Sequence, residues 1–170
     1  MKIRDKLLFI AILPMVLSIV VGVVQHRNAE AIDRCNEKAG LADELYKQMA
    51  SLNQLTMEHH MFYEERSHVQ WQEQHTSLGA RLAQVAPLFN SEEERSAFAR
   101  ITRSHTTLGF IFEQYGPHHR HGDRPDWSKY AERITNRILQ ELEVAMPEVD
   151  RLHEINHAAA IAIGWQQTRL

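Results

Sequence analysis

Histidines are the side chains of this sequence whose type and spacing could do chemistry. The chain has 11 histidines in 170 residues, and His59, His75 and His105 fall in helical seams where an apolar residue is expected. His59 precedes Ser67 by eight residues and His75 follows it by eight, so both lie roughly 12 Å from that turn at about 1.5 Å per residue. His75 and His105 are each 15 residues from Asn90. We therefore predict that the three histidines share one layer of a helical core.

Such a layer has two interpretations. Imidazoles that converge from facing helices can hold zinc, nickel, copper or haem iron, and three protein ligands would leave one position open for a small molecule. On this reading His59, His75 and His105 form a metal site, although the sequence does not say whether the cofactor is a transition metal or haem. On the other reading they are a hydrogen-bonded polar layer that fixes the register of the helices.

Two further histidine patterns are visible. A loop between Gly116 and Pro125 carries His118, His119 and His121, and His68 lies at the other predicted turn on the same side. Short histidine-rich tracts can bind metal, but they are also compatible with an ordinary solvated loop.

The second pattern, His153-Glu154-Ile155-Asn156-His157, matches the H-E-x-x-H helix of zinc metalloproteases. Only 13 residues follow His157, and the motif falls in a predicted membrane-proximal helix without a cleft, so we do not predict proteolysis. The sequence contains no Gly-rich phosphate loop and no nucleophile elbow. We expect no enzyme activity here, with any kinase or cyclase activity in a C-terminal region beyond residue 170.

The N-terminus has the pattern of a membrane anchor. Residues 7–24 are uncharged and follow a tail, residues 1–6, that contains Lys2, Arg4 and Lys6. A run of 18 residues just spans a bilayer as a helix, and the positive-inside rule leaves the tail in the cytoplasm and residues 25–170 outside. The alternative is a cleaved signal peptide with Ala29-Glu30-Ala31 as its site.

The remainder of the chain predicts four helices. Apolar residues step by three and four along four segments, which is the narrow seam that bundle helices bury. Ser67 with Gln70 and Ser91 with Glu94 read as capping boxes that begin the second and third helices. Pro147 should kink the fourth helix or divide it. Because the connections between the helices are short, neighbouring helices should run antiparallel. We therefore predict an all-α, up-down-up-down four-helix bundle whose first helix continues the transmembrane helix.

The lengths of the predicted helices indicate a second copy of this chain as a partner, and the net charge argues against nucleic acid. The outer helices are longer than the middle two, which predicts a two-helix stalk that cannot bury its own seam and hence a parallel homodimer. Cys35, the single cysteine, is then an ordinary residue, a free thiol or a pairing partner across that dimer. The net charge of −3 gives no basic surface for nucleic acid.

The layout resembles known receptors. The start Met1-Lys-Ile-Arg-Asp-Lys-Leu-Leu-Phe9, the apolar helix with a mid-span proline and the segment from Trp71 to Phe112 are similar to sensor histidine kinases. Methyl-accepting chemotaxis receptors and some membrane diguanylate cyclases share this architecture. The resemblance implies a periplasmic sensor domain that is anchored in a bacterial inner membrane. It also implies a second membrane helix and a cytoplasmic output region after Leu170.

We therefore expect a signal-sensing domain that passes a helix movement across the membrane, with a small-molecule or metal ligand as a possible trigger. The alternative is a membrane-tethered periplasmic metal-binding protein of the metal-resistance sensor or carrier type, which the histidine content favours.

Overall fold

The computed structural model is all α-helical and describes residues 3–62, 65–115 and 127–167. Side chains are described for residues 12–59, 66–114, 129 and 132–165. Within this part of the chain the elements are α1 (Ile3–Phe62), α2 (Glu65–Val85), the short 3₁₀ turn η1 (Ala86–Leu88), α3 (Glu92–Tyr115) and α4 (Trp127–Gln167). The all-α prediction and the long N-terminal helix that continues into the bundle are confirmed.

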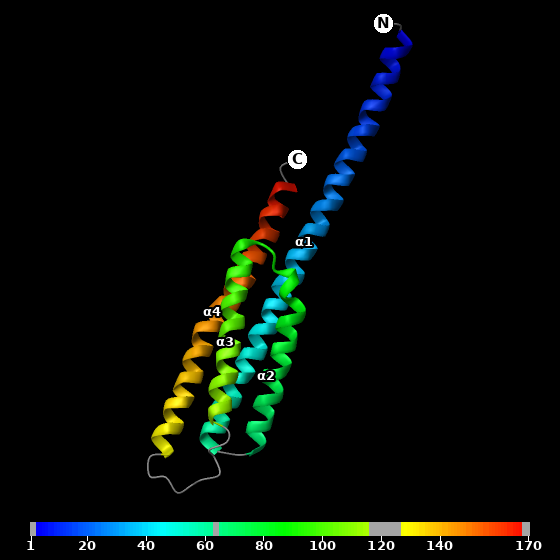
Figure 1. The fold of residues 1–170 in the computed structure, drawn as a ribbon. Coiled ribbons are helices and arrows are strands. Elements are labelled where there is room, and N and C mark those ends of the chain that lie inside the picture. The colour runs from blue at the N-terminus through cyan, green and yellow to red at the C-terminus, as the bar shows by residue number, and fades with distance from the viewer. Residues whose placement is uncertain (1–2, 63–64, 116–126, 168–170) are drawn as a thin grey trace. The chain divides into compact units, whose positions relative to one another are not determined.

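The chain divides into two compact units. One consists of residues 38–155 and the other of residues 1–37 with 156–170. The larger unit holds the bundle, in which α1, α2, α3 and α4 alternate in direction (Figure 1). This confirms the up-down-up-down arrangement.

The predicted seams form the core of the bundle, because they are the apolar faces that water leaves when the helices pack. Every seam contributes side chains that are at most 3 % exposed, including Leu45, Trp71, Ile101 and Leu142. Beside the seams lie residues that the spacing did not predict. Four of these are fully or almost fully buried: Ala42, Met49, Ala97 and Ile111.

The two predicted capping boxes have different outcomes. At the start of α3 the backbone N–H of Glu94 donates to Ser91 Oγ at 3.1 Å, and the backbone N–H of Ser91 donates to Glu94 Oε2 at 2.8 Å. This box is confirmed. The Ser67 box is wrong, because α2 already begins at Glu65 and the hydroxyl of Ser67 bonds to His59 instead.

Pro147 does not divide α4, which is one helix of 41 residues. A proline cannot donate to the carbonyl four residues before it, here that of Glu143. Both residues are exposed, so water can satisfy that carbonyl and the helix continues.

The smaller unit contains the apolar segment of α1. By length and composition, this is the one helix of the described chain that could cross a membrane. Its large apolar side chains are exposed, as Leu13 at 61 % and Met15 at 67 % illustrate. It has the properties of either a membrane anchor or a signal sequence. The histidine-rich loop with His118, His119 and His121 lies outside the described residues.

Candidate functional site

A column of neighbouring rings, most of them stacked, runs through the bundle and contains the three predicted seam histidines. Its members come from α1, α2 and α3, and successive ring centroids are between 3.7 and 5.7 Å apart. Aromatic rings packed within about 7 Å of one another attract. In order, the rings are His105, His75, Trp71, Phe112, His68 and His59.

At one end of the column, His75 of α2 and His105 of α3 form a reciprocal pair. Their ring planes are 6° apart and their centroids are 3.9 Å apart. Nε2 of His75 lies 2.9 Å from the backbone oxygen of His105, and Nε2 of His105 lies 2.9 Å from the backbone oxygen of His75. Because a carbonyl oxygen only accepts hydrogen bonds, each Nε2 must carry a hydrogen. The two hydrogen bonds therefore fix the same tautomer in both neutral rings.

Two glycines make room for this pair. A Cβ atom at Gly109 would lie 2.7 Å from Cε1 of His75, and one at Gly79 would lie 2.9 Å from Cε1 of His105. Neither distance is compatible with a side chain unless the ring moves. A glycine inside a helix costs about 1 kcal/mol relative to alanine, so these helices give up stability where the imidazoles lie against their backbones.

The pair stems from a short internal repeat that the spacing argument missed. His75-Thr-Ser-Leu-Gly79 on α2 and His105-Thr-Thr-Leu-Gly109 on α3 differ at one position. The two segments also pack alike, because the leucine of each, Leu78 or Leu108, is fully buried. Each histidine lies over the glycine of the other segment. A search for self-similarity, rather than for seam positions alone, would have found it.

The electrostatic environment favours the neutral form of His75. Burial lowers the pKa of His75 below its ordinary value, and the nearby His105 acts in the same direction. The bond to the His105 carbonyl and the carboxylate of Glu113 raise the pKa but do not offset the lowering. Two unit charges about 4 Å apart repel by about 4 kcal/mol at an effective dielectric constant of about 20. A charge on His105 would therefore oppose the protonation of His75.

Two other parts of the column, Trp71 and the end at His59, are bonded to neighbouring polar groups. Nε1–H of Trp71 donates to Thr56 Oγ1 at 2.9 Å, and that hydroxyl donates to the Leu52 carbonyl at 2.8 Å. His59 is 3 % exposed, and its Nδ1 lies 3.0 Å from Ser67 Oγ. This end is a buried, hydrogen-bonded network that joins α1 to α2.

The predicted histidine layer is therefore only partly assembled. His75 and His105 are adjacent, whereas the described rings that contact His59 include those of His68 and Phe112. Among the side chains that the structure describes, no three from His, Cys, Asp and Glu are grouped so that they could hold a metal ion. A metal or haem at these histidines stays a prediction from the sequence.

The H-E-x-x-H residues His153, Glu154 and His157 lie on α4, and all three side chains are exposed. Nδ1 of His153 donates to the backbone oxygen of Ala39 on α1, at 3.3 Å. The hydrogen bond from His153 thus links α4 to α1.

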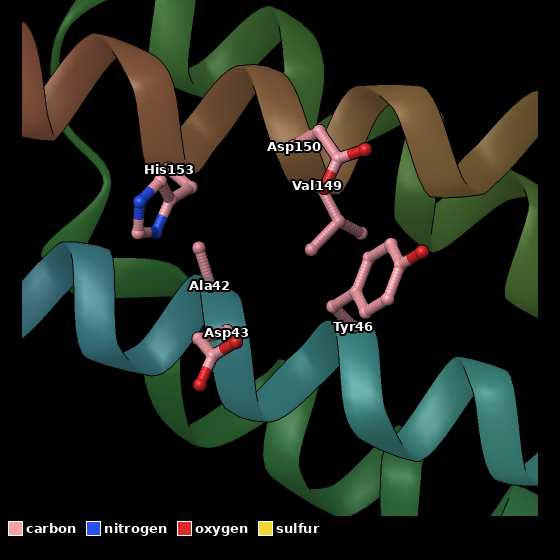
Figure 2. Close-up of a pocket in the computed structure, with 6 residues that line it drawn as sticks. All are labelled: Ala42, Asp43, Tyr46, Val149, Asp150 and His153. Atoms are coloured by element: carbon pink, nitrogen blue, oxygen red, sulfur yellow. The ribbon is translucent and has the colours of Figure 1, made fainter.

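A pocket of about 230 Å³ lies between α1 and α4 beside this link (Figure 2). The buried residues Ala42 and Val149 contribute apolar surface to it. Asp43 and Asp150 add carboxylates, and the carboxylate of Asp43 pairs with the ammonium of Lys47 at 2.6 Å. The full lining is Ala42, Asp43, Tyr46, Val149, Asp150 and His153.

The chain matches no protein-family model, and neither the curated proteins nor the solved structures contain a significant match to it.

Proposed function

We propose that the chain is the extracytoplasmic sensor domain of a bacterial transmembrane receptor of the histidine kinase or chemotaxis receptor type. The observation that carries the proposal is α1, a single helix from Ile3 to Phe62. It begins with the apolar segment and supplies buried core residues to the bundle, such as Leu45 and Leu52. A change in the packing of α1 in the bundle is therefore a change in the helix that would enter the membrane.

The contacts between helices support a mechanism based on relative helix movement. Ion pairs join α1 to α3 through Lys38 and Glu94, and α3 to α4 through Arg100 and Glu148. Small sliding or rotation of packed helices is a common two-state mechanism in signalling proteins. We propose that a signal in the bundle moves α4 relative to α1 and that the membrane-spanning region passes this movement on.

A topology experiment tests the proposal. A reporter enzyme that is active only in the periplasm is fused after Arg66, and a reporter active only in the cytoplasm is fused at the same position. The first should be active and the second inactive, because Lys2, Arg4 and Lys6 retain the N-terminus inside. The opposite result would exclude an extracytoplasmic sensor. A processed N-terminus in the purified protein would identify a signal peptide instead of an anchor.

The second candidate function is a membrane-tethered metal-binding protein, which the concentration of imidazoles in the column favours. Isothermal titration of the full chain in micelles with zinc, nickel, copper and haem separates the two candidates. Binding that His75→Ala abolishes and His119→Ala retains would support a metal site in the core. No binding tighter than about 100 μM, equivalent to about −5.5 kcal/mol, would exclude it.

A further inference from the structure

We propose that the pocket between α1 and α4 binds a small organic ammonium ion, a protonated amine with an apolar group, and that this ion is the signal read by the bundle. The inference rests on the proposed sensor function and gives the class of its ligand. It is carried by the lining of the pocket, which combines carboxylates from two helices with an aromatic ring and buried apolar side chains. The whole lining belongs to the unit of residues 38–155.

Both helices contribute polar groups to the pocket. Asp43 and Tyr46 come from α1, and Asp150 and His153 come from α4 (Figure 2). The rest of the lining is apolar and buried. The volume of about 230 Å³ is below the range of about 300–1,000 Å³ that is typical of sites for drug-sized ligands. The pocket therefore has room for a small ligand with a short apolar group.

Charge decides which class of ligand suits this lining. Asp43 and Asp150 repel an anion, and a neutral ligand would take hydration from both carboxylates without supplying a charge. A metal ion lacks ligands, because the described side chains offer no group of three from His, Cys, Asp and Glu. An ammonium ion supplies a positive charge and several N–H donors to the carboxylates. Its apolar group is removed from water against the buried surface and the ring of Tyr46.

The pocket wall already binds one ammonium group. Nζ of Lys47, one turn further along α1, lies 2.6 Å from Oδ2 of Asp43, and both side chains are more than half exposed. An exposed pair of this kind contributes little to stability, so Asp43 can exchange its partner. The ion pairs between described side chains do not include Asp150. A ligand ammonium would therefore pair with Asp150 and compete with Lys47 for Asp43.

A cation at this place would act on the helix movement proposed above. Carboxylates on facing helices repel each other, and a cation between them is attracted to both. His153 already joins α4 to the Ala39 carbonyl of α1 at 3.3 Å, and the ligand would add a second link beside it. A ligand shifts an equilibrium only toward the arrangement that it binds better. Here that arrangement is the one in which α1 and α4 hold both carboxylates within reach of one ammonium group.

Benzylamine at neutral pH, where it is protonated, is the probe. It is titrated calorimetrically into the full chain in non-ionic detergent micelles, with protein-free micelles as the blank. We expect a dissociation constant below about 1 mM. Benzyl alcohol and benzoate, which have the same ring but no positive charge, should bind at least about 10-fold more weakly. Calcium chloride that bound as tightly as benzylamine would overturn the proposal, because the carboxylates alone would then be sufficient.

Two matched pairs of variants locate the site. Asp150→Asn keeps the size of the side chain but removes its charge, and it should weaken binding about 10-fold or more. Asp33→Asn, which removes an exposed carboxylate of α1 outside the lining, should change it by less than about 2-fold. Lys47→Gln removes the competitor for Asp43 and should tighten binding about 2-fold or more.

Arg34→Gln is the control for Lys47→Gln, because it breaks another exposed ion pair of α1 at the same spacing, and it should leave binding unchanged. Equal dissociation constants in Asp150→Asn and Asp33→Asn would overturn the proposal, as would a Lys47→Gln variant that does not bind more tightly than Arg34→Gln. All four substituted side chains are exposed, so the bundle should tolerate the changes.

A second measurement covers a variant that fails to fold. If circular dichroism shows that Asp150→Asn has lost helix, thermal unfolding of the unmodified chain is followed with benzylamine and with benzyl alcohol. A midpoint raised by the amine alone supports the proposal, and equal effects overturn it. A negative result with an active periplasmic reporter after Arg66 overturns the amine site and leaves the receptor proposal standing. An inactive reporter with amine binding that depends on Asp150 overturns the receptor proposal alone.

Discussion

The ammonium of Lys38 on α1 lies 2.9 Å from Oε1 of Glu94 in the first turn of α3. Oε2 of the same carboxylate accepts hydrogen bonds from the backbone N–H groups of Asn90 at 3.0 Å and Ser91 at 2.8 Å. The Glu94 side chain is 4 % exposed and that of Lys38 is 19 % exposed. One carboxylate therefore caps α3 and joins it to α1.

Replacing Glu94 should destabilise the bundle strongly. Glu94→Ala leaves a largely buried ammonium unpaired and two backbone N–H groups without their acceptor, and we expect a loss of about 2–4 kcal/mol in the free energy of unfolding. Glu94→Gln should lose less, because its amide oxygen can still accept from the backbone. Urea unfolding of the full chain in micelles, followed by circular dichroism, measures both.

Glu93 provides the control for this prediction. It is the preceding residue of the same acidic turn, and its side chain is exposed. Glu93→Ala should change the free energy of unfolding by no more than about 0.5 kcal/mol. Equal losses in Glu93→Ala and Glu94→Ala would show that helix charge, and not the bond to Lys38, is the origin of the effect.

The sequence predicts the fold well because the relevant signal is local. Apolar side chains that recur every three or four residues must share a face, whichever helix they meet. Leu45, Trp71, Ile101 and Leu142, one from each seam, are buried accordingly. A cap such as Ser91 with Glu94 is equally local, and it is found as predicted.

The candidate site depends on information that residue spacing does not contain. Counting from the turns places His75 and His105 at one height, and the two rings do meet. The same count places His59 with them, but height alone does not set how far each helix is rotated about its axis. The rotation of the helices brings Trp71 and Phe112 into the column between His59 and the pair. The role of Gly109 likewise follows only from the contact between two helices.

A methyl group at Gly109 should disrupt the pair. The ring of His75 is held between Trp71 and His105, so it cannot readily yield to a Cβ atom 2.7 Å away. We expect Gly109→Ala to lower the free energy of unfolding by about 1–3 kcal/mol, although alanine favours helix. Adding His75→Ala should remove the clash, so that the double variant is more stable than the sum of the single losses predicts.

Gly40 is the matched control. It also lies inside a helix, and a Cβ atom there would have nothing within 4 Å apart from its chain neighbours and the backbone of its own helix. Gly40→Ala should therefore raise the free energy of unfolding by up to about 1 kcal/mol. If Gly109→Ala stabilised the protein as Gly40→Ala does, the rings would not be confined as the contacts indicate.

Stability should fall with acidification in two ranges that begin at different pH values. The pKa of His75 is lowered in the folded state, chiefly by burial, so the unfolded chain takes up its proton first. The stability contributed by the neutral ring is complete above about pH 6.5, the unfolded value, and is lost as the pH falls through the lower folded pKa. His75→Gln should remove the pH dependence in this range.

The second pH range in which stability is lost comes from the protonation of Glu94. Burial acts to raise the pKa of its carboxyl, but the bonds from Ser91 and Lys38 outweigh burial and lower it. Its contribution is therefore complete above about pH 4.3, the unfolded value, and is lost at lower pH. Urea midpoints measured at each pH should show that His75→Gln alters only the upper range and Glu94→Gln only the lower one. A single transition affected equally by both variants would contradict this assignment.

Cys35 should report a parallel dimer through α1. It is a partly exposed free thiol on that helix, and in a parallel pair the two copies lie at the same height. Mild oxidation of membranes should give a disulfide-linked dimer on a non-reducing gel, and Cys35→Ser should abolish it. Glu37→Cys in the Cys35→Ser background is the control, because two residues further along moves the thiol about 200° around the helix. Equal crosslinking at residues 35 and 37 would indicate random collision, and a monomer at every concentration in sedimentation would exclude the dimer.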